Sequence, residues 1–290
     1  MIKLKKPIYN QENIIDDCIS NMRDKNSTKS RVVSSKNEIV SKSKEYDELA
    51  QKGQLGTLRE YENIKGGATK SDMLILYDQK FARKEQGGRK YYDAIKLLAP
   101  YGRCPLCGQR EVKTLDHYLP KSKFPLYAVT PYNLIPACSD CNTGKLDSTF
   151  HNRVDKFNDV SICREKETIH PYYDDFTDEV WIKAKMIEED PITFEFYVKK
   201  PKNWDDLKYK RACYHFEKFG LNKLYKPYAC EMFTGCLPRL RRLLKKSGRA
   251  AVEEHIKECI DEAREVRLNT WQAAVYESIL ECEWFWNEYL

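Results

Sequence analysis

Two closely spaced pairs of cysteines constrain this chain more than any other feature of its sequence. Cys104 and Cys107 are separated by two residues and followed by Gly108, and Cys138 and Cys141 repeat the spacing. Two intervening residues let both sulfurs of a pair reach one metal ion at about 2.3 Å, and the glycine permits a tight turn. The sequence therefore predicts a tetrahedral structural zinc site with these four cysteines as ligands.

The segment between the two pairs is 30 residues long, which is more than a plain zinc ribbon needs. It contains Asp116-His117, then Asn133, and Asn142 directly follows the last of the four cysteines. We expect a strand that ends in Asp-His, a loop, a second short strand and a helix with Asn142 near its start. This order predicts a small ββα module over residues 101–150.

The residue types in this segment suit the hydrolysis of a phosphodiester, which needs an activated water, a cation and a stabilised leaving oxygen. A neutral imidazole can take a proton from water near pH 7, so His117 is the candidate general base. Asp116 and Asn142 offer the hard oxygen ligands that magnesium or manganese prefers. Lys121 and Lys145 are candidate substrate contacts, as point charges beside a phosphate. We expect the side chain of His117 to be partly exposed and to contact only water and substrate.

At these positions the sequence resembles the HNH endonucleases, in the branch of that family that carries zinc on four cysteines. Asp116-His117 matches the first signature element, Asn133 the middle asparagine, and Asn142 the third element, which is often His and sometimes Asn. The resemblance covers residues 101–150, about a sixth of the chain. It implies metal-dependent cleavage of nucleic acid, with DNA favoured over RNA. It also implies that Asn133 orients the base through the hairpin backbone without touching substrate.

The arrangement is similar to the HNH subunits of bacterial anti-phage systems such as the Septu type, which work with an ATPase. Loops of the type that binds nucleotide phosphates are missing from the two long flanking regions of the sequence. The resemblance therefore implies an ATPase or a sensor protein as a separate partner chain.

Each of these residues also has a plainer interpretation. The cysteine pairs can be buried without metal, and a lone histidine such as His117 is often only solvated or hydrogen-bonded. Asn133 can cap a turn and Asn142 a helix, and both lysines can be ordinary surface residues. His151 and His170 are expected to have structural roles. The alternative for the whole protein is a catalytically silent, zinc-stabilised module that binds nucleic acid or protein.

The flanks of the module predict a mostly α chain of the α+β class in three parts. Residues 1–100 form a basic helical region, in which 27–43 has few large apolar residues and is either a mobile arm or a solvated helix. Residues 101–150 form the module. Residues 151–290 begin with a β-hairpin near 180–198, where apolar residues alternate on either side of a turn, and continue as helices.

The net charge of +6 is unevenly distributed: residues 1–100 carry +6, residues 101–150 carry +2 and residues 151–290 carry −2. Such basicity is compatible with a phosphate-bearing partner and equally with solvated lysines. The basic run Arg239–Lys246 is interpreted as a solvated helix face, with a nucleic-acid patch as the alternative. No apolar run approaches the roughly 20 residues of a membrane span, and the N-terminus is too charged for a secretory signal, so we expect a cytoplasmic protein without a membrane partner.

Overall fold

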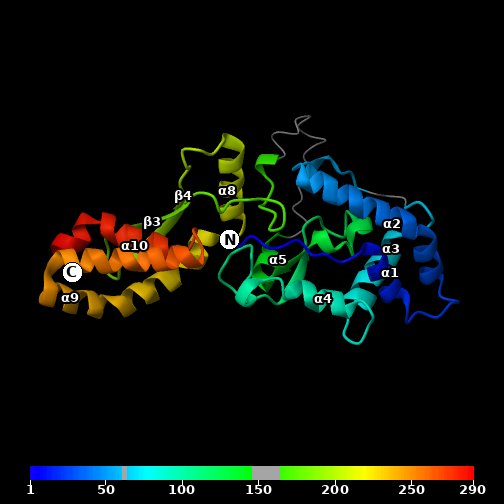
Figure 1. The fold of residues 1–290 in the computed structure, drawn as a ribbon, viewed down its shortest axis with the longest axis horizontal. Helices are drawn as coiled ribbons and strands as arrows, with labels where there is room; N and C mark the ends of the chain where they lie inside the picture. The colour runs from blue at the N-terminus through cyan, green and yellow to red at the C-terminus, as the bar shows by residue number, and fades with distance from the viewer. Residues whose placement is uncertain (61–63, 146–163) are drawn as a thin grey trace. The chain divides into compact units, whose positions relative to one another are not determined.

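The computed structural model describes residues 1–60, 64–145 and 164–290, and the statements below concern these residues. The chain forms two compact units, one of Ile2–Asp174 and the other chiefly of Asp175–Leu290. The described residues are mostly helical and include two small antiparallel sheets of two strands each (Figure 1). The expected α+β class with a helical majority is therefore confirmed.

The first unit begins with helices that surround one buried core. Their boundaries are α1 Gln11–Ile19, α2 Ser27–Gln51, α3 Lys70–Ile75, the π-helix η2 Leu76–Phe81 and α4 Arg89–Lys96. Side-chain caps fix the starts of three of them, because Asn10, Asn26 and Thr69 each accept a backbone N–H of the first helical turn. Short 3-10 turns follow at Leu55–Thr57, Pro100–Gly102, Pro125–Tyr127 and Pro131–Asn133.

Helix α2 corrects the interpretation of residues 27–43 as a mobile arm or a solvated helix. The segment is helical, but Val32, Ile39 and Tyr46 are fully buried along one face of it. These three residues are spaced by seven, which is close to two helical turns and brings them onto the same face. The few apolar residues therefore suffice to pack the helix, although their density in the sequence is low.

A small ββα arrangement follows the N-terminal helices. Strand β1 (Thr114–His117) pairs antiparallel with β2 (Leu134–Ala137), with Thr114 opposite Ala137 and His117 opposite Leu134. Helix α5 (Ser139–Lys145) comes directly after β2. Leu115, Leu126 and Leu134 belong to the same buried cluster as side chains of α1, α2, α3 and η2. The ββα residues and the N-terminal helices thus share one hydrophobic core.

The second unit contains a β-hairpin packed against helices. Strands β3 (Ile182–Ile187) and β4 (Thr193–Val198) pair antiparallel, at the place where the sequence predicts a hairpin. Ala184, Met186, Phe194 and Phe196 are buried on one face of this sheet, and α9 and α10 contact its strands. The helices are α8 Asp206–Lys218, α9 Leu221–Val266, α10 Trp271–Glu281 and the π-helix η6 Phe285–Tyr289.

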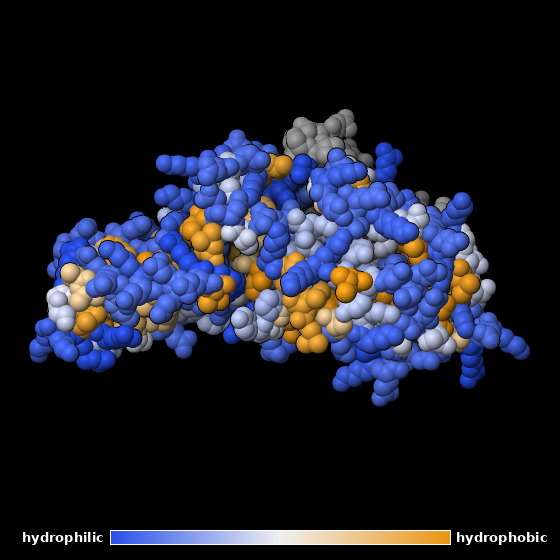
Figure 2. Space-filling model, viewed as in Figure 1, coloured by the Kyte–Doolittle hydropathy of each residue, from blue (hydrophilic) through white to orange (hydrophobic). Residues whose placement is uncertain are grey.

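Helix α9 is interrupted at Gly248, whose φ of 80° and ψ of 178° are not helical. The helix turns back on itself at this point (Figure 1). The surface drawn in Figure 2 is mainly hydrophilic, with apolar residues in small groups. Within the described ranges, the helices are all too short or too polar to cross a membrane.

Candidate functional site

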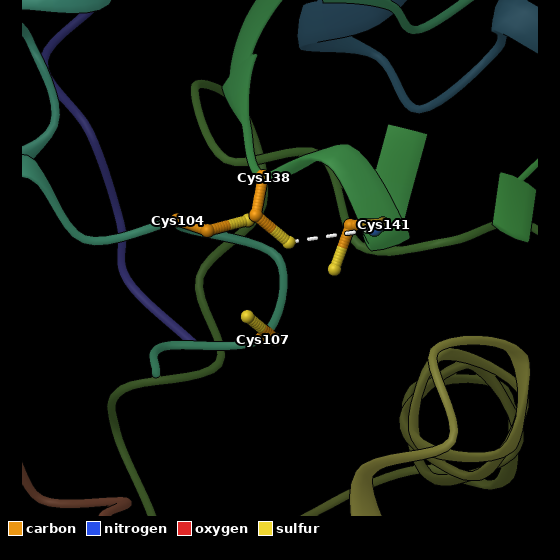
Figure 3. Close-up of side chains that lie close together, drawn as sticks. All are labelled: Cys104, Cys107, Cys138 and Cys141. Carbon is orange, nitrogen blue, oxygen red and sulfur yellow. Dashed lines mark hydrogen bonds between the residues drawn. The ribbon is translucent and has the colours of Figure 1, made fainter. Parts of the chain in front are cut away.

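The four cysteines of the two pairs converge on one point of the first unit. The side chains of Cys104, Cys107, Cys138 and Cys141 are all buried, and their sulfur atoms lie within 4.8 Å of one another. They point toward a common centre, two from the loop that precedes β1 and two from the start of α5 (Figure 3). Four zinc–sulfur bonds of about 2.3 Å place the sulfurs of a tetrahedron about 3.8 Å apart. The cluster therefore has the size and donor set of a zinc-like metal site.

Backbone amides support each cysteine pair. The N–H of Arg110 donates to Sγ of Cys107, and the N–H of Cys141 donates to Sγ of Cys138, both at 3.4 Å. Gly108 has a positive φ of 70°, which a glycine adopts without strain, and it closes the first turn by donating to the carbonyl of Cys104. These bonds stabilise thiolates, which is the form in which cysteine binds a metal.

Helix α5 connects the cysteine cluster with the Asp116-His117 end of β1. The helix begins beside Cys138, and its last residue, Lys145, lies at the opposite end of the strand pair. The Nζ of Lys145 donates to Oδ2 of Asp116 at 2.9 Å and to the carbonyl of His117 at 2.8 Å. A metal at the cysteines would thus fix the helix that holds Lys145 against Asp116.

His117 is buried, with 8% of its surface exposed, whereas the sequence suggested a partly exposed side chain. Its Nε2 lies 2.8 Å from the carbonyl of Ala128, and the ring of Tyr77 packs edge-on at 4.3 Å between centroids. Burial lowers the pKa of His117 to about 3, since the charged imidazolium is poorly solvated there. A carbonyl only accepts, so the neutral ring carries its proton on Nε2 and keeps a lone pair on Nδ1.

Asp116 and Lys145 form a buried ion pair next to this histidine. Their side chains are 10% and 8% exposed. Burial raises the pKa of Asp116, and the neighbouring Lys145 ammonium opposes that rise by stabilising the carboxylate. The structure thus places Lys145, which the sequence suggested as a substrate contact or a surface residue, below the surface with its charge on Asp116.

Lys121 contacts the ring of Tyr77, which packs against His117. Its ammonium forms an ion pair with Asp78 and lies 4.5 Å from the ring centre of Tyr77. Tyr77 and Asp78 both belong to η2, so this π-helix contacts both the candidate base and a candidate substrate lysine. Tyr77 and His117 are about 40 positions apart, and no sequence spacing could have indicated that Tyr77 covers His117.

The two asparagines have different environments. Asn133 is fully buried, and its side chain accepts from the N–H of Leu119 at 2.7 Å and donates to the carbonyls of Leu119 and Tyr127 at 3.0 and 3.1 Å. Its own carbonyl accepts from the N–H of Tyr118. Asn133 therefore fixes the backbone on both sides of the loop after His117. Asn142 lies in the first turn of α5 and is half-buried.

Of the two histidines expected to be structural, His170 lies outside this group of residues. His170 is buried, its Nε2 lies 3.2 Å from the hydroxyl of Tyr46, and its Nδ1 accepts the N–H of Tyr172. His151 falls within residues 146–163, which are outside the described part of the chain, as are the last five residues of the expected module.

Comparison with known proteins gives a similarity to a phage protein. The chain is 27% identical over 306 residues to Protein ea31 of Escherichia phage lambda, and the match covers 99% of each chain. No family model and no solved structure matches the chain. The similarity to the phage protein extends through both compact units, so the two proteins correspond over their whole length.

Proposed function

We propose that this protein is a metal-dependent endonuclease of the HNH type, which hydrolyses phosphodiester bonds of DNA and, as the second substrate class, of RNA. The observation that carries the proposal is the state of His117. Its Nε2 donates to the carbonyl of Ala128, which leaves the lone pair of Nδ1 as a proton acceptor on the residue that follows Asp116 in β1. A neutral ring with an available lone pair can accept a proton from water, which supports His117 as the general base, while its pKa of about 3 makes it a weak one.

The remaining residues have complementary roles in this proposal. Asp116 and Asn142 offer hard oxygen ligands for magnesium or manganese, which would neutralise charge at the phosphate and at the leaving oxygen. Burial raises the pKa of Asp116 and the Lys145 ammonium opposes the rise, so a bound cation would stabilise the carboxylate in the same way. Asn133 positions the loop after His117, and Lys121 attracts the anionic substrate.

The cysteine cluster has a structural role in the proposal. Zinc held by four thiolates has no open position for substrate. Bound there, it joins the loop before β1 to the start of α5, and α5 in turn holds Lys145 at Asp116. Metal binding at the cysteines therefore maintains the geometry of the histidine site without taking part in hydrolysis.

Cleavage by the full-length protein tests the proposal. Supercoiled plasmid and a structured RNA are incubated with the protein, with and without added magnesium or manganese. We expect nicked or cut product only with the divalent ion, and a rate that is lower by about a hundredfold or more in His117→Gln. Equal cleavage by wild type and His117→Gln would show that a contaminant or another site is responsible.

The silent binding module predicts a different result in the same experiment. Nucleic acid would be bound by wild type and by His117→Gln with the same affinity, and neither protein would cut under any metal condition. That outcome would replace the nuclease proposal, while the metal site at the four cysteines would stand.

A further inference from the structure

The cations of the second unit are concentrated in one stretch. Residues 175–290 carry 20 Lys and Arg against 21 Asp and Glu, so the unit as a whole is nearly neutral. Residues 232–252, here called the basic segment, hold six of these cations and no acidic residue. The rest of the unit has 14 cations against 21 acids. The six cations are Arg239, Arg241, Arg242, Lys245, Lys246 and Arg249.

The basic segment lies where α9 turns back at Gly248 (Figure 1). Arg239, Arg242 and Lys246 are exposed residues of the arm that precedes this turn. Their spacings of three and four residues place them on one helical face. They extend over roughly 10 Å along the axis, at about 1.5 Å per residue. The arm therefore presents a row of positive charge.

These three cations are not committed to partners within the described part of the chain, where no ion pair or hydrogen bond of their side chains occurs. The neighbouring cations differ, since Arg249 binds Glu253 at 2.7 Å and Arg241 donates to the carbonyl of Tyr289. An uncommitted, exposed row of cations is available to an external anion.

The row forms one wall of a groove of about 510 Å³ between the two arms of α9. The opposite wall carries Glu254, His255 and Glu258. These two carboxylates would repel an anion that enters deeply, so an anionic chain would lie along the rim formed by the first arm. This geometry favours an extended polyanion over a small anion enclosed in the groove.

We propose that the basic segment binds the phosphate backbone of nucleic acid. A duplex carries one charge per about 1.7 Å, or roughly six charges along the 10 Å of the cationic row. Four of the six cations are arginines, whose planar donor groups match phosphate oxygens. The proposal rests on the proposed function for the choice of nucleic acid as the polymer, but the contact itself does not depend on cleavage.

The composition of the segment disfavours an anionic membrane as the partner. A helix that lies on a membrane also needs exposed apolar side chains to insert among the lipids. Among the described residues of the second unit, the exposed large hydrophobic residues are Tyr197, Tyr228 and Val266, and all three lie outside the basic segment.

Binding of a short labelled DNA duplex to the full-length protein, without added divalent metal, tests the proposal. The test variant is Arg239→Gln/Arg242→Gln/Lys246→Gln. Its control, Lys185→Gln/Lys199→Gln/Lys202→Gln, removes the same charge from exposed lysines elsewhere in the unit. We expect the test variant to bind at least about tenfold more weakly, and the slope of log affinity against log salt to fall by about 2 to 3, or roughly 0.9 for each lost phosphate contact. The control should remain close to wild type.

Other outcomes overturn the proposal and are separable from a failure of the nuclease proposal. Equal affinity of the test and control variants would show that only overall charge matters. Binding of wild type to vesicles of anionic phospholipid, with none to DNA, would assign the segment to membranes. If DNA is bound through the segment but never cut, the nuclease proposal fails and this one stands. If DNA is cut while the test variant binds DNA as tightly as wild type does, the proposal for the basic segment fails and the nuclease proposal stands.

Discussion

The ammonium of Lys145 lies 2.9 Å from the carboxylate of Asp116, and both side chains are almost completely buried. The pair joins the last residue of α5 to the strand that bears His117, while the first turn of α5 carries Cys141 of the cysteine cluster. A seven-residue helix thus has a metal-type site at one end and an ion pair at the other. The geometry at Asp116 depends on both ends.

Removing the ammonium of Lys145 should destabilise the protein. We expect Lys145→Met to lower the free energy of unfolding by about 3 kcal/mol or more, since it leaves the buried Asp116 without a compensating charge. Urea denaturation at neutral pH measures this. Lys113→Met is the matched control, because Lys113 forms an ion pair with Glu111 that is more than half exposed and should matter by less than about 1 kcal/mol. Similar losses in both variants would contradict the buried role of Lys145.

Loss of one thiolate and loss of the imidazole should differ in their effects. We expect Cys104→Ser to lose most of about one bound metal ion per chain and to melt at a lower temperature, because metal binding contributes to folding. His117→Gln should keep the metal, since an amide N–H can still donate to Ala128, and should lose cleavage. Cys230→Ser, a half-buried cysteine outside the cluster, is the control for thiol loss. If His117→Gln lost its metal as Cys104→Ser does, His117 would be part of the structural site.

The imidazole of His117 should not titrate in the physiological range. Burial lowers its pKa to about 3, so we expect its ring nitrogens to show the neutral Nε2–H form at every pH from about 8 to 5. Because the unfolded chain protonates this ring near pH 6.5, the stabilisation from neutral His117 is complete above that pH and is lost progressively as the pH falls below it. Nitrogen NMR of labelled histidine measures both the tautomer and the midpoint. A midpoint near 6.5 would mean that Tyr77 does not cover the ring in solution.

Asp72 provides a second pH-dependent contribution, of the carboxylate type. Its side chain is 2% exposed and accepts from Arg31, Thr28 and Thr69, and the bond to Arg31 above all holds its pKa well below the usual range. The stabilisation is therefore present above the unfolded pKa of about 3.9 and is lost as the pH falls further. We expect Asp72→Asn to cost about 2 kcal/mol at pH 7, with the difference from wild type shrinking below about pH 5.

Denaturation of the two proteins at a series of pH values measures that difference. Asp24→Asn is the control, because the side chain of Asp24 is almost fully exposed where it pairs with Lys29 and its loss should change stability little at any pH. A pH-independent gap between Asp72→Asn and wild type would show that the carboxylate charge is not what stabilises this site.

Local patterns in the sequence predicted the features that depend on short spacing. The Cys-x-x-Cys pairs predicted the cluster of Cys104, Cys107, Cys138 and Cys141, and the alternation of apolar residues predicted the hairpin of β3 and β4. Both follow from local geometry, in which two intervening residues set the distance between thiols and alternate residues share a strand face.

Features that depend on long-range packing were not predictable in this way. The large apolar residues that bury one face of α2 are only three, spaced by seven. In the sequence, so few apolar residues do not distinguish a packed helix from a solvated one. The cover of Tyr77 over His117 and the ion pair of Lys121 with Asp78 join residues about 40 positions apart. The sequence is rich in lysines, most of which are expected at the surface, so it did not predict that Lys145 is buried. The partner of Lys145, Asp116, can be identified only once α5 is placed against β1.

The hydrophobic core that Leu115, Leu126 and Leu134 share with α1, α2 and η2 makes the ββα residues depend on the N-terminal helices for their burial. A fragment that begins near residue 100 would expose these side chains to water and lose the ring that covers His117. Joining the ββα segment to a different N-terminal region would leave these side chains without the residues that bury them. The fragment expected to fold with a covered His117 is therefore the whole compact unit Ile2–Asp174.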